Sequence, residues 1–327
     1  MNETHALERI QRAAARLSAA LERLDLGGGR EVVVAFSGGA DSLALLALLG
    51  LVPRRLQPSI EAVHVDHGLR PDSASDARSA AALAASLGVP CRVVTMDAAR
   101  GRGGLEAVAR RGRYEALAAA AAGRTILTAH TADDQAETAL YRLSKGTGIR
   151  GLAGIRPVVR LAGAVVARPL LEVERSVLHG VVRDLGLRPV EDPTNATGLF
   201  ARNRLRHDVL PALERAVGGA SANLARAARL AAEDERYLES RAARALSRIA
   251  LGDGCDAARL ARLPAALRGR IVRSLVTDAG GRVPAAAEVE RILSLAKRGG
   301  ELHLARGLVV RARAGILTVR KGRTGRG

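Results

Sequence analysis

The sequence predicts an α/β protein: a doubly wound parallel sheet with helices on both faces, followed by a second, smaller mixed α/β domain. In the first half of the chain, four short, apolar, β-branched runs are each followed by a helical stretch, which is typical of parallel sheets buried on both sides. The 327 residues exceed one average domain, and 48% hydrophobic against 26% charged residues is a globular balance. We therefore expect two folded domains.

The expected elements follow the chain in order. Apolar residues at helical spacing predict a leading helix over residues 3–24, which ends before Gly27. Four pairs of a strand and a helix come next, at 31–36 with 42–49, 60–65 with 73–87, 92–95 with 105–122, and 125–128 with 132–143.

Beyond Gly146 the pattern changes to short apolar runs punctuated by glycine and proline. They predict a hairpin around residues 158–166, appended to the sheet, then a helix over 174–185 and an arginine-rich linker over 191–211. We therefore divide the chain into a domain of residues 1–210 and a C-terminal domain of residues 211–327. The latter should contain helices at 213–250, 263–279 and 285–296, then strands at 302–313 and 315–319.

The net charge of +18 suggests a polyanionic partner. Only Lys145, Lys297 and Lys321 are lysines among the 51 basic residues, so a compositional bias toward arginine is an alternative explanation. The excess is uneven, because residues 211–327 hold 23 basic and 11 acidic residues. Binding to a phosphate backbone needs such an asymmetry, although a solvated basic tail accounts for it equally well.

Several protein classes are excluded. The longest apolar run, Leu43–Val52, is about half of the roughly 20 residues that a membrane-spanning helix needs, so we expect no membrane partner. The N-terminus lacks a signal pattern. Cys91 and Cys255 are too far apart in the chain for a Cys-x-x-Cys motif, and a reducing, cytoplasmic location fits.

The segment Ser37-Gly38-Gly39-Ala40-Asp41-Ser42 lies between a predicted strand and a predicted helix. Backbone N–H groups converge there with the positive end of the helix dipole, and glycines allow close approach to phosphate oxygens. An ordinary β–α turn is the alternative. Neither Gly-x-x-x-x-Gly-Lys nor Gly-x-Gly-x-x-Gly is present. The segment instead resembles the pyrophosphate loop of the ATP pyrophosphatases.

A second polar segment follows the fourth predicted strand. Thr131 and Asp134 have the spacing of a helix N-cap and its N3 partner, and Asp133 and Glu137 add two further acids. These carboxylates should lie at the carboxyl edge of the sheet, where open α/β sheets bind ligands. They could hold Mg²⁺, a substrate ammonium or both, or they could be a solvated first helical turn.

Together with five further motifs, these segments resemble the tRNA(Ile)-lysidine synthetase family over about residues 30–215. The motifs are Val65-Asp66-His67-Gly68-Leu69-Arg70, the run from Glu106 to Tyr114, Arg168-Pro169-Leu170-Leu171, Asp192-Pro193-Thr194-Asn195 and the run from Arg202 to His207. The resemblance implies an adenine nucleotide alpha hydrolase-like fold. Many relatives have a second histidine where Thr131 stands, which leaves the role of that imidazole in doubt.

The resemblance implies that ATP adenylates the C2 carbonyl oxygen of the wobble cytidine in a tRNA(Ile) with a CAU anticodon. The ε-amine of free L-lysine then displaces AMP. We expect Asp41, Arg113, Asp134 and Glu137 to be catalytic, with Asp134 and Glu137 binding lysine. ATP should bind at residues 37–42, with Mg²⁺ on Asp41, and tRNA should contact Arg202, Arg204 and Arg206.

Some assignments stay open at the level of sequence. His67 and His130 could be structural or could contact a ligand, and Tyr114 could stack on a base, although a helical tyrosine more often packs in a core. Another ATP pyrophosphatase, such as a tRNA thiolase or an amidotransferase-type synthetase, is a rival function. The lack of paired cysteines disfavours the first and the lack of an N-terminal cysteine the second. A non-catalytic, nucleotide-regulated RNA-binding protein is a third candidate, and a homodimer is compatible with the sequence.

Overall fold

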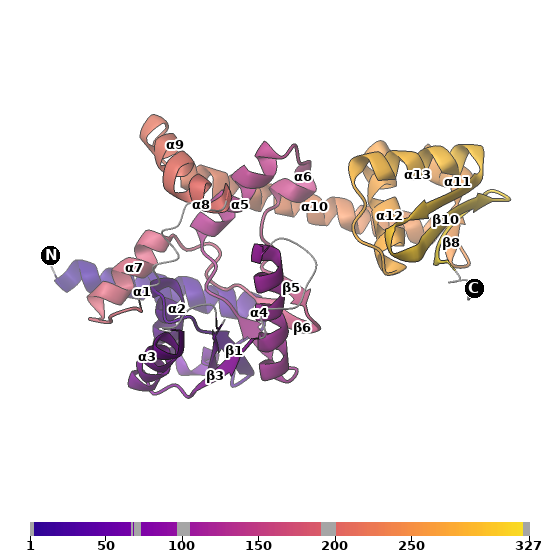
Figure 1. The fold of residues 1–327 in the computed structure, drawn as a ribbon. Coiled ribbons are helices and arrows are strands. Elements are labelled where there is room, and N and C mark those ends of the chain that lie inside the picture. The colour runs from indigo at the N-terminus through magenta and orange to yellow at the C-terminus, as the bar shows by residue number, and fades with distance from the viewer. Residues whose placement is uncertain (1–2, 67, 69–72, 97–104, 191–200, 323–327) are drawn as a thin grey trace. The chain divides into compact units, whose positions relative to one another are not determined.

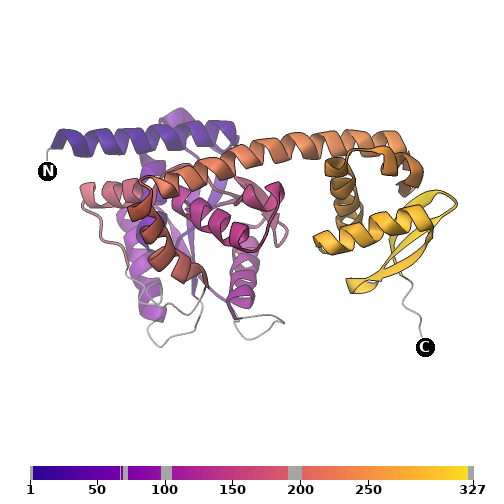
Figure 2. The same ribbon diagram turned by 90° about the horizontal axis from the view of Figure 1, so that it is seen from above.

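The computed structural model describes residues 3–66, 68, 73–96, 105–190 and 201–322. These residues divide into two compact units, Met1–Ala232 and Glu233–Gly327. The boundary falls inside the helix α10 (Ala220–Ile249), which Figure 2 shows as one unbroken helix, and not at residue 210, where the arginine-rich segment ends. The helical pattern of the sequence continues through this position, so nothing in the composition marks it as a boundary between two units.

The first unit is built on a six-stranded sheet in the order β3-β2-β1-β4-β6-β5 (Figure 1). The four predicted strands and the helices that follow them are confirmed. Their bounds are β1 (Glu31–Ala35), α2 (Ala40–Leu51), β2 (Ser59–Asp66), α3 (Ser73–Ser86), β3 (Cys91–Thr95), α4 (Leu105–Ala121), β4 (Thr125–Leu127) and α5 (Ala132–Ser144), after the leading helix α1 (Glu3–Arg23).

The predicted hairpin forms β5 (Val158–Leu161) and β6 (Ala164–Ala167). It is not an appendage, because β6 pairs in parallel with β4 and makes β5 the antiparallel edge strand. The helix α6 (Ile149–Leu152) precedes the hairpin, and α7 (Arg175–Asp184) follows it, close to the predicted position.

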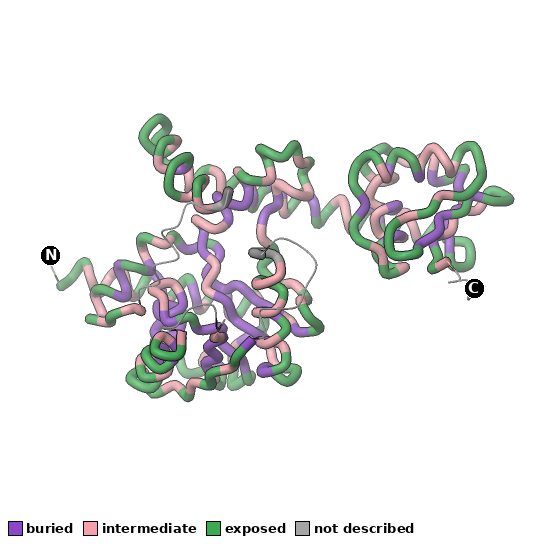
Figure 3. Tube along the Cα trace, viewed as in Figure 1, coloured by how far each residue is buried: buried purple, intermediate pink, exposed green. Residues whose placement is uncertain are grey.

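Successive side chains of the central strand β1 point to opposite faces of the sheet, and each face is covered by its own helices. Val32 and Val34 pack with α1, α2, α3 and α7 on one face, while Val33 and Ala35 pack with α4 on the other. Figure 3 shows the resulting buried positions along the strands and α2. β1 lies between β2 and β4, so strand order reverses there, and the loops after β1 and β4 meet at the carboxyl edge.

The region predicted as a linker over 191–211 is partly helical. Residues 201–209 form α8 (Ala201–Arg204) and the π-helical turn η3 (Leu205–Val209), whereas 191–200 lie outside the described residues. The helix predicted over 213–250 is interrupted: α9 (Leu210–Ala216) ends before α10 because Gly219 has a φ of +75°.

The second unit is an antiparallel sheet in the order β7-β8-β11-β10-β9, covered by helices that share its core. The run predicted as one strand over 302–313 turns at Arg306 and Gly307, both at positive φ, and so becomes two paired strands. The elements are β7 (Ala250–Leu251), β8 (Gly254–Asp256), α11 (Ala257–Arg262), α12 (Ala265–Asp278), α13 (Ala286–Arg298), β9 (Gly300–Leu304), β10 (Leu308–Arg313) and β11 (Ile316–Lys321).

No helix in the described part of the chain is long and apolar enough to cross a membrane.

Candidate functional site

The segment of residues 37–42 forms a tight turn between β1 and α2. The Ser37 hydroxyl lies 3.1 Å from the Ser42 hydroxyl and accepts a hydrogen bond from the Gly39 N–H at 3.3 Å. Gly38 has a φ of +82°, and a Cβ there would lie 3.0 Å from Val190 Cγ2. Glycine is favoured at this position, because the positive φ strains other residues and a Cβ would crowd Val190.

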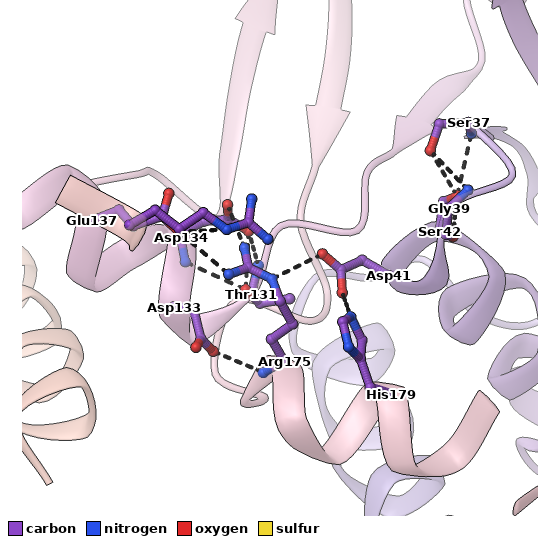
Figure 4. Close-up of polar contacts among 11 residues, drawn as sticks. Ser37, Gly39, Asp41, Ser42, Thr131, Asp133, Asp134, Glu137, Arg175 and His179 are labelled. Carbon is purple, nitrogen blue, oxygen red and sulfur yellow. Dashed lines mark hydrogen bonds and ion pairs between the residues drawn. The ribbon is translucent and has the colours of Figure 1, made fainter. Parts of the chain in front are cut away.

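The first turn of α2 carries Asp41, whose two oxygens are engaged by two side chains of α7 (Figure 4). Oδ2 accepts a hydrogen bond from Arg175 Nε at 3.1 Å, and Oδ1 lies 3.0 Å from His179 Nε2. α2 is apolar on all sides and its core residues are buried, so this turn is held rigidly at the sheet edge.

The predicted capping box at the start of α5 is present. Asp134 Oδ2 accepts hydrogen bonds from the Thr131 N–H at 2.8 Å and from its hydroxyl at 3.0 Å, while Asp134 N–H donates to that hydroxyl. Thr131 therefore serves to fix Asp134 in place. Asp134 Oδ1 remains directed at Arg175.

Arg175 joins the carboxylates of α2 and α5 into one acidic cluster, which we define as Asp41, Asp133, Asp134 and Glu137. Its guanidinium donates to Asp134 Oδ1 at 3.0 Å and to Glu137 Oε1 at 3.3 Å, in addition to Asp41. Its backbone N–H donates to Asp133 Oδ2 at 2.8 Å. The segment before α7 is fixed to α5 by a hydrogen bond from Ala132 N–H to the Val173 carbonyl, which brings the two helices to this point.

The electrostatics follow from this geometry. Burial acts to raise the pKa of Asp134, but the Arg175 charge and the Thr131 donors outweigh it and hold that pKa below its ordinary value. Burial opposes the charge on Arg175, yet the surrounding carboxylates raise its pKa. Glu137 is 3% exposed and has a second cation, Arg206, with Nε 3.6 Å from its Oε1.

Two histidines line the same sheet edge. His64 Nδ1 lies 3.1 Å from the carbonyl of Phe36, the residue immediately before residues 37–42, which we call the phosphate loop. Burial lowers the pKa of His64. His130 Nδ1 lies 2.8 Å from the Thr128 hydroxyl. Burial, together with nearby arginines, lowers the pKa of His130 to about 3, so its ring is neutral at physiological pH. His67 lies outside the described residues.

The structure thus brings together Asp41, Asp134 and Glu137 from the set of predicted catalytic residues. Arg113 lies on α4, outside the acidic cluster, where burial lowers its pKa and where no hydrogen bond or ion pair is found among the described residues. Arg204 is exposed, Arg206 reaches Glu137, and the side chain of Arg202 lies outside the described part of the chain. Tyr114 is buried in the core, as expected for a packing role.

Neither Arg175 nor His179 was predicted from the sequence as a site residue. One signal was available: Arg175 opens a helix, where a positive charge is disfavoured by the helix dipole unless acids surround it. Among the described residues, no group of three or more His, Cys, Asp or Glu is arranged to hold a metal ion.

Comparisons with known proteins agree with this geometry. Residues 7–213 match the PP-loop domain family, and residues 256–317 match the TilS substrate binding domain family. A U34-tRNA thiolase from Methanococcus maripaludis shares the fold, with a TM-score of 0.56 and 18% identity over 69% of this chain and 79% of that one.

Curated relatives match most of the chain. The tRNA(Ile)-lysidine synthase of Salinispora tropica is 44% identical over 298 residues, which cover 88% of this chain and 90% of that protein. The enzyme of the same name from Mycolicibacterium paratuberculosis is 45% identical over 281 residues, 86% of this chain and 83% of that protein. On this evidence, added to the phosphate loop and the acidic cluster beside it, the chain belongs to the tRNA(Ile)-lysidine synthase family.

Proposed function

We propose that this site attaches free lysine to C2 of the wobble cytidine of a tRNA(Ile) with a CAU anticodon, at the expense of ATP. The C2 carbonyl oxygen attacks the α-phosphorus of ATP and pyrophosphate leaves. The lysine ε-amine then attacks C2, and that oxygen departs with AMP. The observation that carries the proposal is the meeting of the phosphate loop and the acidic cluster at one sheet edge (Figure 4).

The phosphate loop supplies the nucleotide half of the site. Residues 37–42 combine closely spaced backbone N–H groups, two serine hydroxyls and the N-terminus of a twelve-residue helix. Such an arrangement stabilises the negative charge that develops on departing pyrophosphate. Arg113, on the helix α4 that covers the other face of the sheet, would add a guanidinium to the same phosphates.

The donor set also fits Mg²⁺ held partly by the nucleotide. Mg²⁺ is commonly bound by one or two carboxylates together with substrate phosphates, and Asp41 is the carboxylate within the phosphate loop itself. Bound there, Mg²⁺ would neutralise phosphate charge. Asp41 would release one of its two present partners, Arg175 or His179, to hold it.

The acidic cluster forms the part of the site that would bind lysine. Four carboxylates face the two arginines Arg175 and Arg206, so these six side chains together carry a formal charge of −2. An additional cation is therefore favoured there. Asp134 and Glu137 would hold the amine of lysine, and a carboxylate of the cluster would take the proton that the amine must lose before it attacks.

Positive charge beyond the cluster would hold the tRNA. Arg204 is exposed on α8, and Arg206 on the following turn connects this segment to Glu137. We assign the basic C-terminal part of the chain, with the TilS substrate binding domain match, to the tRNA backbone. A cytoplasmic location and a homodimer remain predictions of the sequence.

The test is to incubate the full chain with ATP, Mg²⁺, labelled lysine and tRNA(Ile) with a CAU anticodon, and then to digest the tRNA to nucleosides. Labelled lysidine is expected from the wild type and from Glu115→Gln, whose carboxylate is exposed on α4. Asp134→Asn should form none. Label found in no nucleoside, with folding confirmed by circular dichroism, would disprove the proposal.

A further inference from the structure

The motif that begins at Arg168 has no role in the chemistry described so far. Arg168 directly follows β6 at the carboxyl edge of the sheet and is only 4% exposed. Its Nη1 donates to the Arg156 carbonyl at 2.7 Å, and its side chain also forms a hydrogen bond with the buried Tyr114. Its Nε is buried and has no hydrogen-bond partner among the described residues.

Arg168 is thus a buried cation without an acidic partner among the described residues. The carboxylates of this edge are engaged elsewhere, by Arg175, His179 and Arg206. Burial of a charge is unfavourable unless an opposite charge and hydrogen bonds compensate for it, and here a backbone carbonyl and a phenol provide the described contacts. The free Nε and the uncompensated charge both favour binding of an anion.

Two other arginines, Arg110 and Arg113, lie near Tyr114, the hydrogen-bond partner of Arg168. The Arg110 guanidinium carbon lies 5.2 Å from the centre of the Tyr114 ring, and Arg113 is one helical turn further along α4. Arg168, Arg110 and Arg113 all interact electrostatically with His130, and so does Asp134, with the opposite sign. His130 is therefore adjacent to a positive group and to the acidic cluster.

The three arginines differ in their other neighbours. Arg113 also interacts electrostatically with His64, which contacts the residue before the phosphate loop. This distribution associates Arg113 with the nucleotide. Arg168 and Arg110 are associated with Tyr114 and with the carbonyl of Arg156.

The arginines and the acidic cluster both lie near the neutral ring of His130. Together they fit a ligand that carries both a negative and a positive group. We propose that Arg168 and Arg110 bind the α-carboxylate of the free amino-acid substrate, while the acidic cluster binds its amine. The inference rests on the proposed function, and it assigns a specificity: the enzyme should recognise lysine by its carboxylate as well as by its side chain. Cadaverine, which is lysine without that carboxylate, should then be a poor substitute.

The experiment compares lysine with cadaverine as the amine in the tRNA reaction, using the full-length wild type and Arg168→Gln. For Arg168→Gln, kcat/KM for lysine should fall by about 30-fold or more, as when one partner of a buried charge pair is removed. The value for cadaverine should stay as it is, so the preference for lysine collapses. ATP–pyrophosphate exchange with tRNA should not change, and Arg168→Lys should recover part of the preference.

Two matched variants on α4 keep the test independent of the stability of Arg168→Gln. Arg110 and Arg111 are neighbours and both are exposed. Arg110→Gln should reduce the preference for lysine over cadaverine, whereas Arg111→Gln should not.

Three outcomes would overturn the inference. In the first, the wild type uses cadaverine as efficiently as lysine. In the second, Arg168→Gln reduces kcat/KM for lysine and for cadaverine by the same factor. In the third, only the KM of Arg168→Gln for ATP rises, which would make Arg168 a phosphate ligand. Formation of lysidine by the wild type in the same experiment separates these failures from a failure of the proposed function.

Discussion

Arg175 should stabilise the first unit strongly, and Arg175→Met tests this. The substitution keeps an unbranched side chain but leaves Asp41, Asp134 and Glu137 without their shared cation. Removal of one partner from a buried ion pair costs about 3–5 kcal/mol, and the 27% exposure of the Asp41 side chain places this site near the low end, at about 3 kcal/mol. For a unit of this size that corresponds to a decrease in Tm of about 6–12 °C.

The effect should depend on pH with a definite sign. The lowered pKa of Asp134 means that its contribution to stability is fully present above the pKa of the unfolded chain and is lost as pH falls through the folded value. Without Arg175, burial acts against the charged form of Asp134, so that carboxylate takes up a proton at a higher pH. The difference in Tm between wild type and variant should therefore narrow from about pH 7 to about pH 4.

Thermal unfolding measured by calorimetry at several pH values provides the assay. Arg183→Met is the matched control, because Arg183 lies on the same helix and is exposed. A variant that melts within about 1 °C of this control, or a difference that widens on acidification, would refute the reasoning.

Four other outcomes are expected. Asp41→Asn should abolish ATP–pyrophosphate exchange but leave tRNA affinity in filter binding nearly unchanged, and retained exchange would remove Asp41 from the nucleotide site. Glu137→Gln should raise KM for lysine more than KM for ATP, whereas the reverse would make the cluster a metal site alone. The carbon resonances of the His130 ring should not titrate in NMR spectra between pH 5 and pH 9, because burial keeps its pKa near 3. Removal of residues 233–327 should raise the Kd for tRNA and reduce the slope of log affinity against log salt by about 0.7–0.9 per lost phosphate contact. Equal slopes, in a chain shown to be folded by circular dichroism, would contradict that role.

The sequence predicted those parts of the site that depend on neighbouring residues. The turn at Ser37–Ser42 and the capping box of Thr131 and Asp134 are local structures, and their residue types specify them directly. Arg175 could not be found in this way, because it lies 134 positions from Asp41 and joins the site only through tertiary packing of α7.

The fold was predictable to a similar degree. The buried strands β1, β2 and β4 have a strong apolar signal, and the edge strand β3 has a short β-branched run, so all four were found. The short strands β7 and β8 and the six-residue helix α11 were missed because so few residues carry no clear periodicity. The domain boundary within α10 was missed because the helical pattern continues through it.

The contact between Gly38 and Val190 has a consequence for engineering of the nucleotide site. Val190 N–H donates to the Gly38 carbonyl at 3.0 Å, and its side chain occupies the space that a Cβ at position 38 would need. The two positions therefore constrain each other across the chain. A library that varies residues 37–42 alone would sample mostly unfolded or misshapen loops at position 38. A larger residue at 190 would press on the same backbone and alter ATP affinity without touching ATP, so redesign has to treat this pair as a single unit.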